Sequence, residues 1–238
     1  MDCAEQFFKN LQESLSAEFG IGKDFLDTSP MAASVPGPHG EFTQKATLTG
    51  FEKELTEAAA EHAGEARNDV QAAEHDFGAR RYRDAAENYQ KSIEALPTLS
   101  ADLNLGAARY SLSDLRQAEE AIHTGMQTVR QKRNRDLEAS FLTNLGGVYR
   151  SQGKLNEALH TYEMAQRIFL ELHQQISNLL GQANTLGNLG NLYRDLGKQA
   201  QALESHQAAL ELFVTPENLL GQAQTLTNIS LVYVDQGQ

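Results

Sequence analysis

The chain has 238 residues, of which 40% are hydrophobic and 22% are charged, and this composition suits a protein that folds around a sizeable core. Its 20 basic and 32 acidic residues give a formal net charge of -12, which disfavours binding to nucleic acid. A single cysteine excludes an internal disulfide framework, and no apolar run reaches the roughly 18 residues of a membrane-spanning helix. We therefore expect a cytoplasmic protein without a membrane span.

Residues 1–27 form the first predicted segment. Apolar residues recur every four positions and predict one amphipathic helix: Cys3, Phe7, Leu11, Leu15 and Phe19. Two roles stay open for this helix. It packs on the rest of the fold as a cap, which we favour, or it is a detachable segment that occupies a groove or docks on another protein.

Residues 28–48 form the second segment. Prolines and glycines crowd into it, with few large apolar side chains, at Pro30, Pro36, Gly37, Pro38 and Gly40. This composition predicts a flexible linker. A helix is expected to begin near Thr49, and residues 49–238 form the third segment.

Internal repeats dominate the third segment. Residues 178–183 (NLLGQA) recur at 218–223, a shift of 40 residues. Residues 188–197 resemble residues 144–153, a shift of 44, and also residues 228–237, again a shift of 40. Such periods indicate a solenoid built from supersecondary units.

Each unit reads as two helices joined by a tight turn. In the third unit a first apolar stripe ends at Tyr149, and a second stripe begins at Leu155. Gly153 and, in the fourth unit, Gly197 suit a turn that needs positive φ. Two earlier units are more divergent, since Arg80 and Ser113 stand where the later units have glycine.

The pattern resembles the tetratricopeptide repeat. In the third unit it is carried by Leu145, Gly146, Tyr149, Gly153, Ala158, Tyr162 and Ala165. In the fourth unit the same pattern is present, but His206 replaces the usual aromatic residue. The longer spacings resemble the extended repeats of the Pins/LGN and kinesin light chain groups. The resemblance implies an all-α, right-handed superhelical solenoid of helix-turn-helix hairpins, with about 4.5 repeats and the last one incomplete.

In this family the first helix of each hairpin lines a concave groove, and the resemblance maps one asparagine column onto its sixth position. The column consists of Asn104, Asn144, Asn188 and Asn228. An amide both donates and accepts hydrogen bonds, so the column could clamp the backbone of an extended peptide. The alternative is that each asparagine bonds to the neighbouring repeat and stabilises stacking.

The twelfth position of the same helices carries Tyr110, Arg150 and Arg194. The arginine pair could hold acidic side chains or a terminal carboxylate of a ligand. The alternative is that these arginines pair with Asp195 or Asp235, and both readings stay open.

No catalytic or metal-binding constellation emerges from the sequence, and we expect no enzymatic activity, metal or cofactor. The predicted function is a protein–protein interaction scaffold or adaptor that binds a peptide segment of a partner in the groove. The alternative is a regulatory domain of a longer enzyme or signalling protein whose catalytic part lies beyond residue 238. The incomplete fifth unit has no second helix to cover its apolar face, which predicts continuation of the chain or self-association. This face consists of Leu226, Ile229, Val232 and Tyr233.

Overall fold

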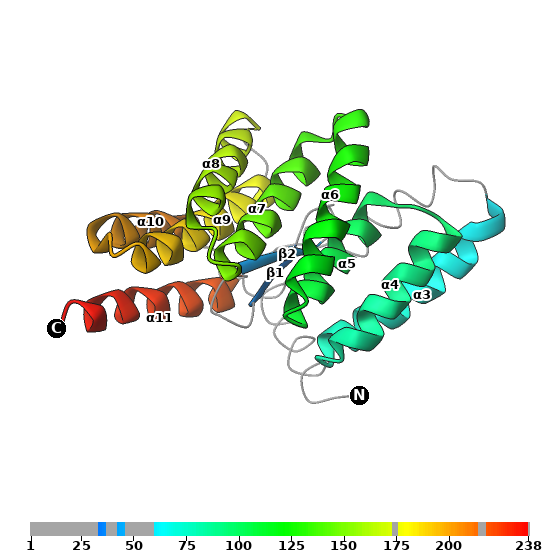
Figure 1. The fold of residues 1–238 in the computed structure, drawn as a ribbon, viewed down its shortest axis with the longest axis horizontal. Coiled ribbons are helices and arrows are strands. Elements are labelled where there is room, and N and C mark those ends of the chain that lie inside the picture. The colour runs from blue at the N-terminus through cyan, green and yellow to red at the C-terminus, as the bar shows by residue number, and fades with distance from the viewer. Residues whose placement is uncertain (1–32, 37–41, 46–59, 173–175, 214–217, 238) are drawn as a thin grey trace, which may run out of the picture.

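The computed structural model describes residues 33–36, 42–45, 60–172, 176–213 and 218–237. The N-terminal helix expected within residues 1–27 lies outside these ranges. Within them the chain forms nine helices and one pair of strands (Figure 1). The helices are α3 (Ala60–Gly78), α4 (Tyr82–Ala95), α5 (Leu99–Ser111), α6 (Leu115–Gln131), α7 (Arg135–Ser151), α8 (Leu155–Glu171), α9 (Ile176–Asp195), α10 (Gln199–Leu212) and α11 (Leu219–Asp235).

Consecutive helices pair as hairpins, and the hairpins stack into a solenoid. The pairs are α3 with α4, α5 with α6, α7 with α8, and α9 with α10, while α11 packs on α10. The first helices α5, α7, α9 and α11 also contact one another in succession, so they form one layer and the second helices form the other. The predicted solenoid of helical hairpins is confirmed.

Glycines allow the two helices of a hairpin to approach closely. A Cβ atom added at Gly146 would lie 2.6 Å from the ring of Tyr162, and one at Gly190 would lie 2.5 Å from the ring of His206. Each ring therefore rests directly on the backbone of the partner helix and fills the space at native packing density. His206 is fully buried, as Tyr162 is, so it occupies the aromatic position of its repeat.

Two short strands lie within the segment expected to be a linker. Strand β1 (Ala33–Pro36) pairs antiparallel with β2 (Phe42–Lys45), with Ala33 opposite Lys45 and Pro36 opposite Phe42. The prediction of a flexible linker over residues 28–48 is wrong for these strands. An isolated two-stranded hairpin is marginally stable in water. Its order here depends on packing against the distant helices α5, α7 and α9, which local composition does not reveal.

The turns inside the hairpins share one backbone conformation. The second residue after the first helix has positive φ in every repeat, at Arg80 (59°), Ser113 (61°), Gly153 (75°), Gly197 (70°) and Gly237 (75°). The expectation of positive φ at Gly153 and Gly197 is confirmed. Because a Cβ atom disfavours this region, the first two repeats carry strain that the later repeats avoid.

We expect opposite effects from the same substitution at two exposed glycines. Gly153→Ala should lower the free energy of unfolding by about 1–2 kcal/mol, because alanine disfavours the left-handed region. Gly64→Ala should raise it by about 0.5–1 kcal/mol, because Gly64 lies inside α3 with nothing within 4 Å of an added Cβ. Urea denaturation followed by circular dichroism measures both, and equal shifts of the same sign would contradict the assignment of strain to the turn.

Candidate functional site

The inner face of the first helices carries a set of small and amide side chains. Residues separated by four and then three positions share a face of a helix. On α5, α7 and α9 this register selects nine residues, all buried, which we call the groove floor: Ser100, Asn104, Ala107, Ser140, Asn144, Gly147, Asn184, Asn188 and Asn191. The floor therefore has short polar groups and no large side chain.

Three asparagines make up the α9 part of the floor. Asn184, Asn188 and Asn191 are 0%, 1% and 2% exposed. Within the described part of the chain, neither Nδ2 nor Oδ1 of Asn184 has a hydrogen-bond partner. A buried polar group in this state costs about 1–3 kcal/mol. The sequence prediction included Asn188 and missed the other two, although their spacing of four and three residues was the signal that could have found them.

Asn104 bonds to the neighbouring repeat, which is the stacking role considered as the alternative for the asparagine column. Its Nδ2 donates to Oε1 of Glu74 on the preceding repeat at 3.1 Å, and the hydroxyl of Tyr89 donates to the same oxygen at 2.5 Å. Asn228, the last member of the column, accepts at Oδ1 from Nε2 of Gln224 on its own helix at 3.3 Å. At Asn104 the amide therefore ties two repeats together, and a ligand role for the column stays a prediction.

The twelfth-position residues connect each first helix to the next one. The hydroxyl of Tyr110 lies 2.9 Å from that of Ser151. Nε of Arg150 donates to Oδ2 of Asp195 at 2.6 Å, and Nε of Arg194 lies 3.6 Å from Oδ2 of Asp235. We call these three links the rim ladder.

The rim ladder matches the alternative in which each arginine pairs with an aspartate of the following repeat. The Arg150 side chain is only 10% exposed and Asp195 is 29% exposed, so water screens that pair less than an ordinary surface pair. The Arg194 pair is more open, with a side chain 22% exposed. A ligand carboxylate would have to compete with these aspartates, and such a role stays a prediction.

The same arginines act on His206. Burial lowers the pKa of His206 to about 4, and the positive charges of Arg194 and Arg150 add to the effect. Neither ring nitrogen has a hydrogen-bond partner within the described residues. The imidazole is therefore neutral in the folded protein at neutral pH.

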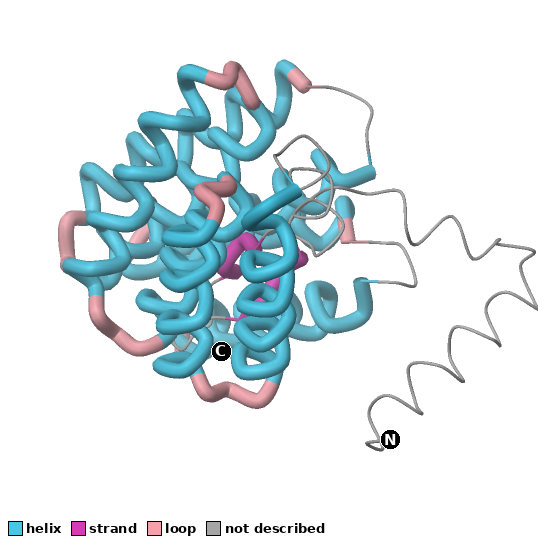
Figure 2. The backbone as a smooth tube through the Cα atoms, turned by 90° about the vertical axis from the view of Figure 1, so that its right-hand side faces the viewer, coloured by secondary structure: helices cyan, strands magenta, loops and turns pink. Residues whose placement is uncertain are grey.

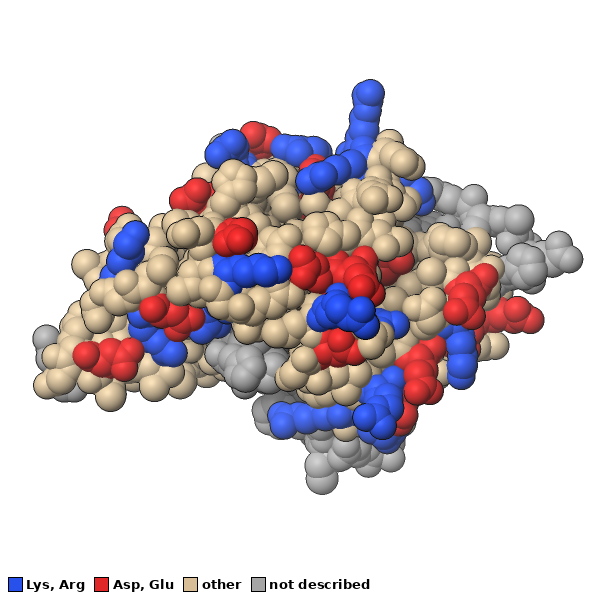
Figure 3. Space-filling view, viewed as in Figure 1, with Lys and Arg blue, Asp and Glu red and all other residues tan. Residues whose placement is uncertain are grey.

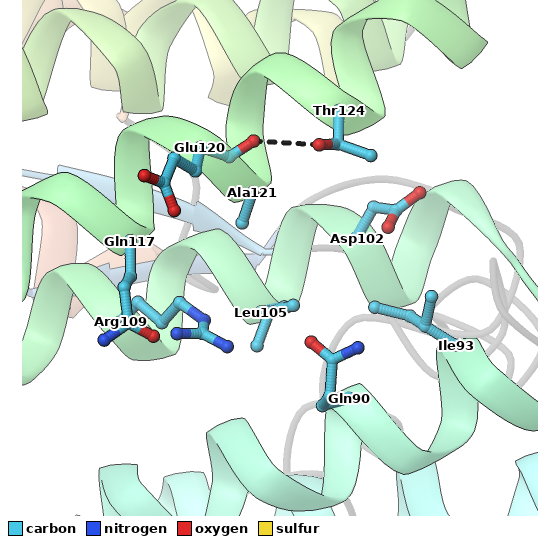
Figure 4. A pocket seen from close by; sticks show the side chains of 9 residues that line it. All are labelled: Gln90, Ile93, Asp102, Leu105, Arg109, Gln117, Glu120, Ala121 and Thr124. Atoms are coloured by element: carbon cyan, nitrogen blue, oxygen red, sulfur yellow. Dashed lines mark hydrogen bonds between the residues drawn. The ribbon is translucent and has the colours of Figure 1, made fainter.

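Two pockets lie between first and second helices, and no residue of the groove floor lines them. A pocket of about 500 Å³ lies between α6, α7 and α8, and one of about 280 Å³ lies between α4, α5 and α6. Figure 4 shows the smaller one, which Gln90, Asp102, Arg109 and Glu120 line. Both charge signs meet there, so the pocket presents no single charge to a ligand.

Charged patches, metal-binding groups and membrane-spanning helices would indicate other kinds of partner for the described residues. Basic and acidic side chains are interspersed over the face seen in Figure 3. No group of three or more His, Cys, Asp or Glu residues within the described ranges could hold a metal ion. None of the described helices is long and apolar enough to cross a membrane.

Comparisons with known proteins agree with this geometry. Sequence profiles of the tetratricopeptide repeat match residues 97–171 and 182–214, without distinguishing the extended-repeat groups. A comparison with curated protein sequences finds no significant match. The crystal structure of BtubC (BKLC) from P. vanneervenii has the same fold, with a TM-score of 0.55 and 17% identity over 79% of this chain and 84% of that one.

Two further solved structures are more distant. The crystal structure of MamA gives a TM-score of 0.47 at 17% identity, over 72% of this chain and 82% of that one. Yeast Tom70 gives 0.42 at 14% identity, over 79% of this chain and 43% of that one.

We expect His206→Tyr to make the fold more resistant to acid. As the pH falls from about 6.5 to 4, the unfolded chain binds a proton that the buried imidazole does not, so stability decreases over this window. Tyrosine fills the same position over glycine in the preceding repeat and has no such proton to bind. The advantage of the variant in free energy of unfolding should grow by about 2 kcal/mol between pH 7.5 and pH 4.5.

Urea denaturation at the two pH values measures this difference. Asp136, whose pKa burial raises to about 6, has the opposite dependence, because its carboxylate is disfavoured in the fold as the pH rises. It is present in both proteins, so its effect cancels in the difference. A difference that is constant with pH would contradict the buried neutral histidine.

Proposed function

We propose that this chain, which is a tetratricopeptide-repeat protein, is a protein-interaction scaffold that binds an extended segment of a partner protein on the groove floor. The observation that carries the proposal is the floor itself. Nine small or amide side chains occupy the same register on three parallel-running first helices. Short side chains let a peptide backbone approach closely, and amides offer a donor and an acceptor to it without reading its side chains.

The scaffold holds this surface rigidly. Each floor residue lies on a helix of the solenoid, and the rim ladder fixes the spacing of successive helices. A preorganised surface loses little conformational freedom on binding, which favours affinity. The role requires no catalytic group, and we place it in the cytoplasm, the compartment that the single cysteine predicts.

A second surface supports self-association. Exposed apolar side chains follow α11 in the described structure: Leu219, Leu220, Leu226, Leu231, Tyr233 and Val234. Val234 is 65% exposed, whereas Val232, which was expected to lack a cover, is fully buried. Exposed apolar side chains gathered on one terminal helix favour an interaction site. A helix of a second copy would cover it. A helix from a longer chain would cover it equally, and this is what favours the alternative function of a regulatory domain.

We expect Leu226→Lys together with Val234→Lys to weaken self-association. Each lysine would have to be desolvated in the interface, so the dimer should weaken at least tenfold. Sedimentation velocity over a concentration series measures the dissociation constant. A monomeric wild-type chain would contradict the proposed contact, and a dimer unaffected by both lysines would place it elsewhere.

We expect Asn144→Ala together with Asn188→Ala to weaken binding of peptides selected from a random phage library on the wild-type chain. Loss of about 1 kcal/mol per hydrogen-bonding site predicts at least tenfold weaker binding. Asn156→Ala, an exposed asparagine of the outer layer, is the matched control. Circular dichroism checks the fold, and unchanged affinity in a folded double variant would contradict the role of the floor.

A further inference from the structure

We propose that the groove floor is closed in the resting protein by the chain's own hairpin β1–β2, so that a partner's extended segment binds by displacing it. This inference rests on the proposed function of the groove. In the resting protein the floor then contacts a segment of the same chain. A partner must displace this segment before it can bind.

The position of the hairpin is the first observation. Strand β2 lies against α5, α7 and α9, and β1 approaches α9. These are the same three helices that carry the floor. Figure 1 shows the strands among these helices, and Figure 2, turned by 90°, shows them enclosed near the middle of the solenoid. The two views agree that an extended segment already crosses the inner face.

The burial of the floor is the second observation. Polar side chains of an open groove would face solvent, yet all nine floor residues are buried. At the two ends of the solenoid the same register is more open, although Arg67 and Glu74 of α3 and Gln224 of α11 are half-buried. Gln71 of α3 is exposed, and Leu231 of α11, in the register of Asn191, is 42% exposed. Asn228 of α11 is buried as well, so burial at that one position does not depend on the strands. All three residues of the register are therefore buried only on the helices α5, α7 and α9, against which β2 lies.

The hairpin is an imperfect occupant. It consists of two strands of four residues, and such a pair is only marginally stable without support. The amide of Asn184 remains without a hydrogen-bond partner in the described, closed structure. A partner segment that bonded this amide would gain roughly tenfold or more in affinity over the hairpin at that position.

Tethering explains how a weak occupant keeps the groove closed. Hairpin and floor belong to one chain, so the hairpin acts at an effective concentration of about 1 mM. If the intrinsic dissociation constant of the hairpin lies tenfold below this concentration, the hairpin weakens the binding of a competitor roughly tenfold. The partner chemistry that fits is a short extended strand or hairpin that offers backbone donors and acceptors.

The first test locates the hairpin in solution. In the full chain with Cys3→Ser and Thr43→Cys, a nitroxide on the new cysteine should broaden the backbone amide signals of floor residues Asn144 and Asn188. A nitroxide at Arg116→Cys, on an exposed position of the outer layer, is the control. Broadening of the floor signals no greater than with the control label would overturn the inference.

The second test measures closure. The probe is a fluorescein-labelled synthetic peptide of residues 28–48, added to the wild-type chain and to a full-length variant whose residues 33–36 and 42–45 are replaced by Gly and Ser. We expect binding to the variant at least tenfold tighter than to the wild type, and Asn144→Ala with Asn188→Ala in the variant should weaken it. Equal affinity for both chains would overturn the closed groove.

The outcomes separate this inference from the proposed function. If phage-selected peptides bind the floor of both chains equally and the 28–48 peptide binds neither, the inference fails and the proposed function stands. If the nitroxide confirms the position of the hairpin but no peptide binds the Gly/Ser variant, both fail, because the hairpin is then a permanent part of the fold.

Discussion

The close approach of the two helices within each hairpin is the contact on which the rest of the structure depends. It is made by a glycine on the first helix and a large side chain on the second, as at Gly146 with Tyr162 and Gly190 with His206. In the second repeat, Ile122 plays the part of the ring over Gly106. This contact sets the tilt of each hairpin, and repetition of the tilt gives the stack one concave layer of first helices. The spacing between side chains on neighbouring first helices therefore follows from this contact.

The polar groups of the first helices add a second level of order. The Arg150–Asp195 pair and the Asn104–Glu74 bond both join neighbouring repeats. Buried ionic and amide bonds of this kind contribute modestly to stability, because desolvation offsets most of the attraction. They do restrict how one repeat can slide on the next, since a shift by one residue would leave buried polar groups unpaired. Apolar packing therefore holds the stack together while the polar links fix its register.

The repeated elements were predictable because their signal is local. Glycine at Gly153 and the apolar stripes on either side specify a helix, a turn and a helix whatever lies elsewhere. Ser113 at the equivalent turn of the second repeat was also recognised, although it pays for its left-handed backbone with strain. The asparagine column was found because it recurs at the repeat period, whereas Asn184 and Asn191 occur in one repeat and were missed.

The strands could not be predicted for a different reason. Nothing in residues 33–45 resembles a strand that is stable by itself, and Pro36 removes one donor from the ladder. Their order comes from surfaces more than fifty residues away, on helices whose own sequences encode only the solenoid. Long-range packing that does not repeat leaves no periodic signal, so the contact of the strands with α5, α7 and α9 was visible only in three dimensions.

The hairpin and its docking surface are far apart in the sequence, and this affects the order in which they become available during synthesis. Residues 33–45 leave the ribosome early, but the surface that receives them is complete only when α9 has emerged, about 150 residues later. At about 5–20 residues per second, this leaves an interval of roughly 10–30 s. During that interval the nascent chain carries an unoccupied inner face and an unpaired extended segment. Strand edges without their docking surface are prone to aggregation, so the youngest form of the protein has a hazard that the mature form lacks.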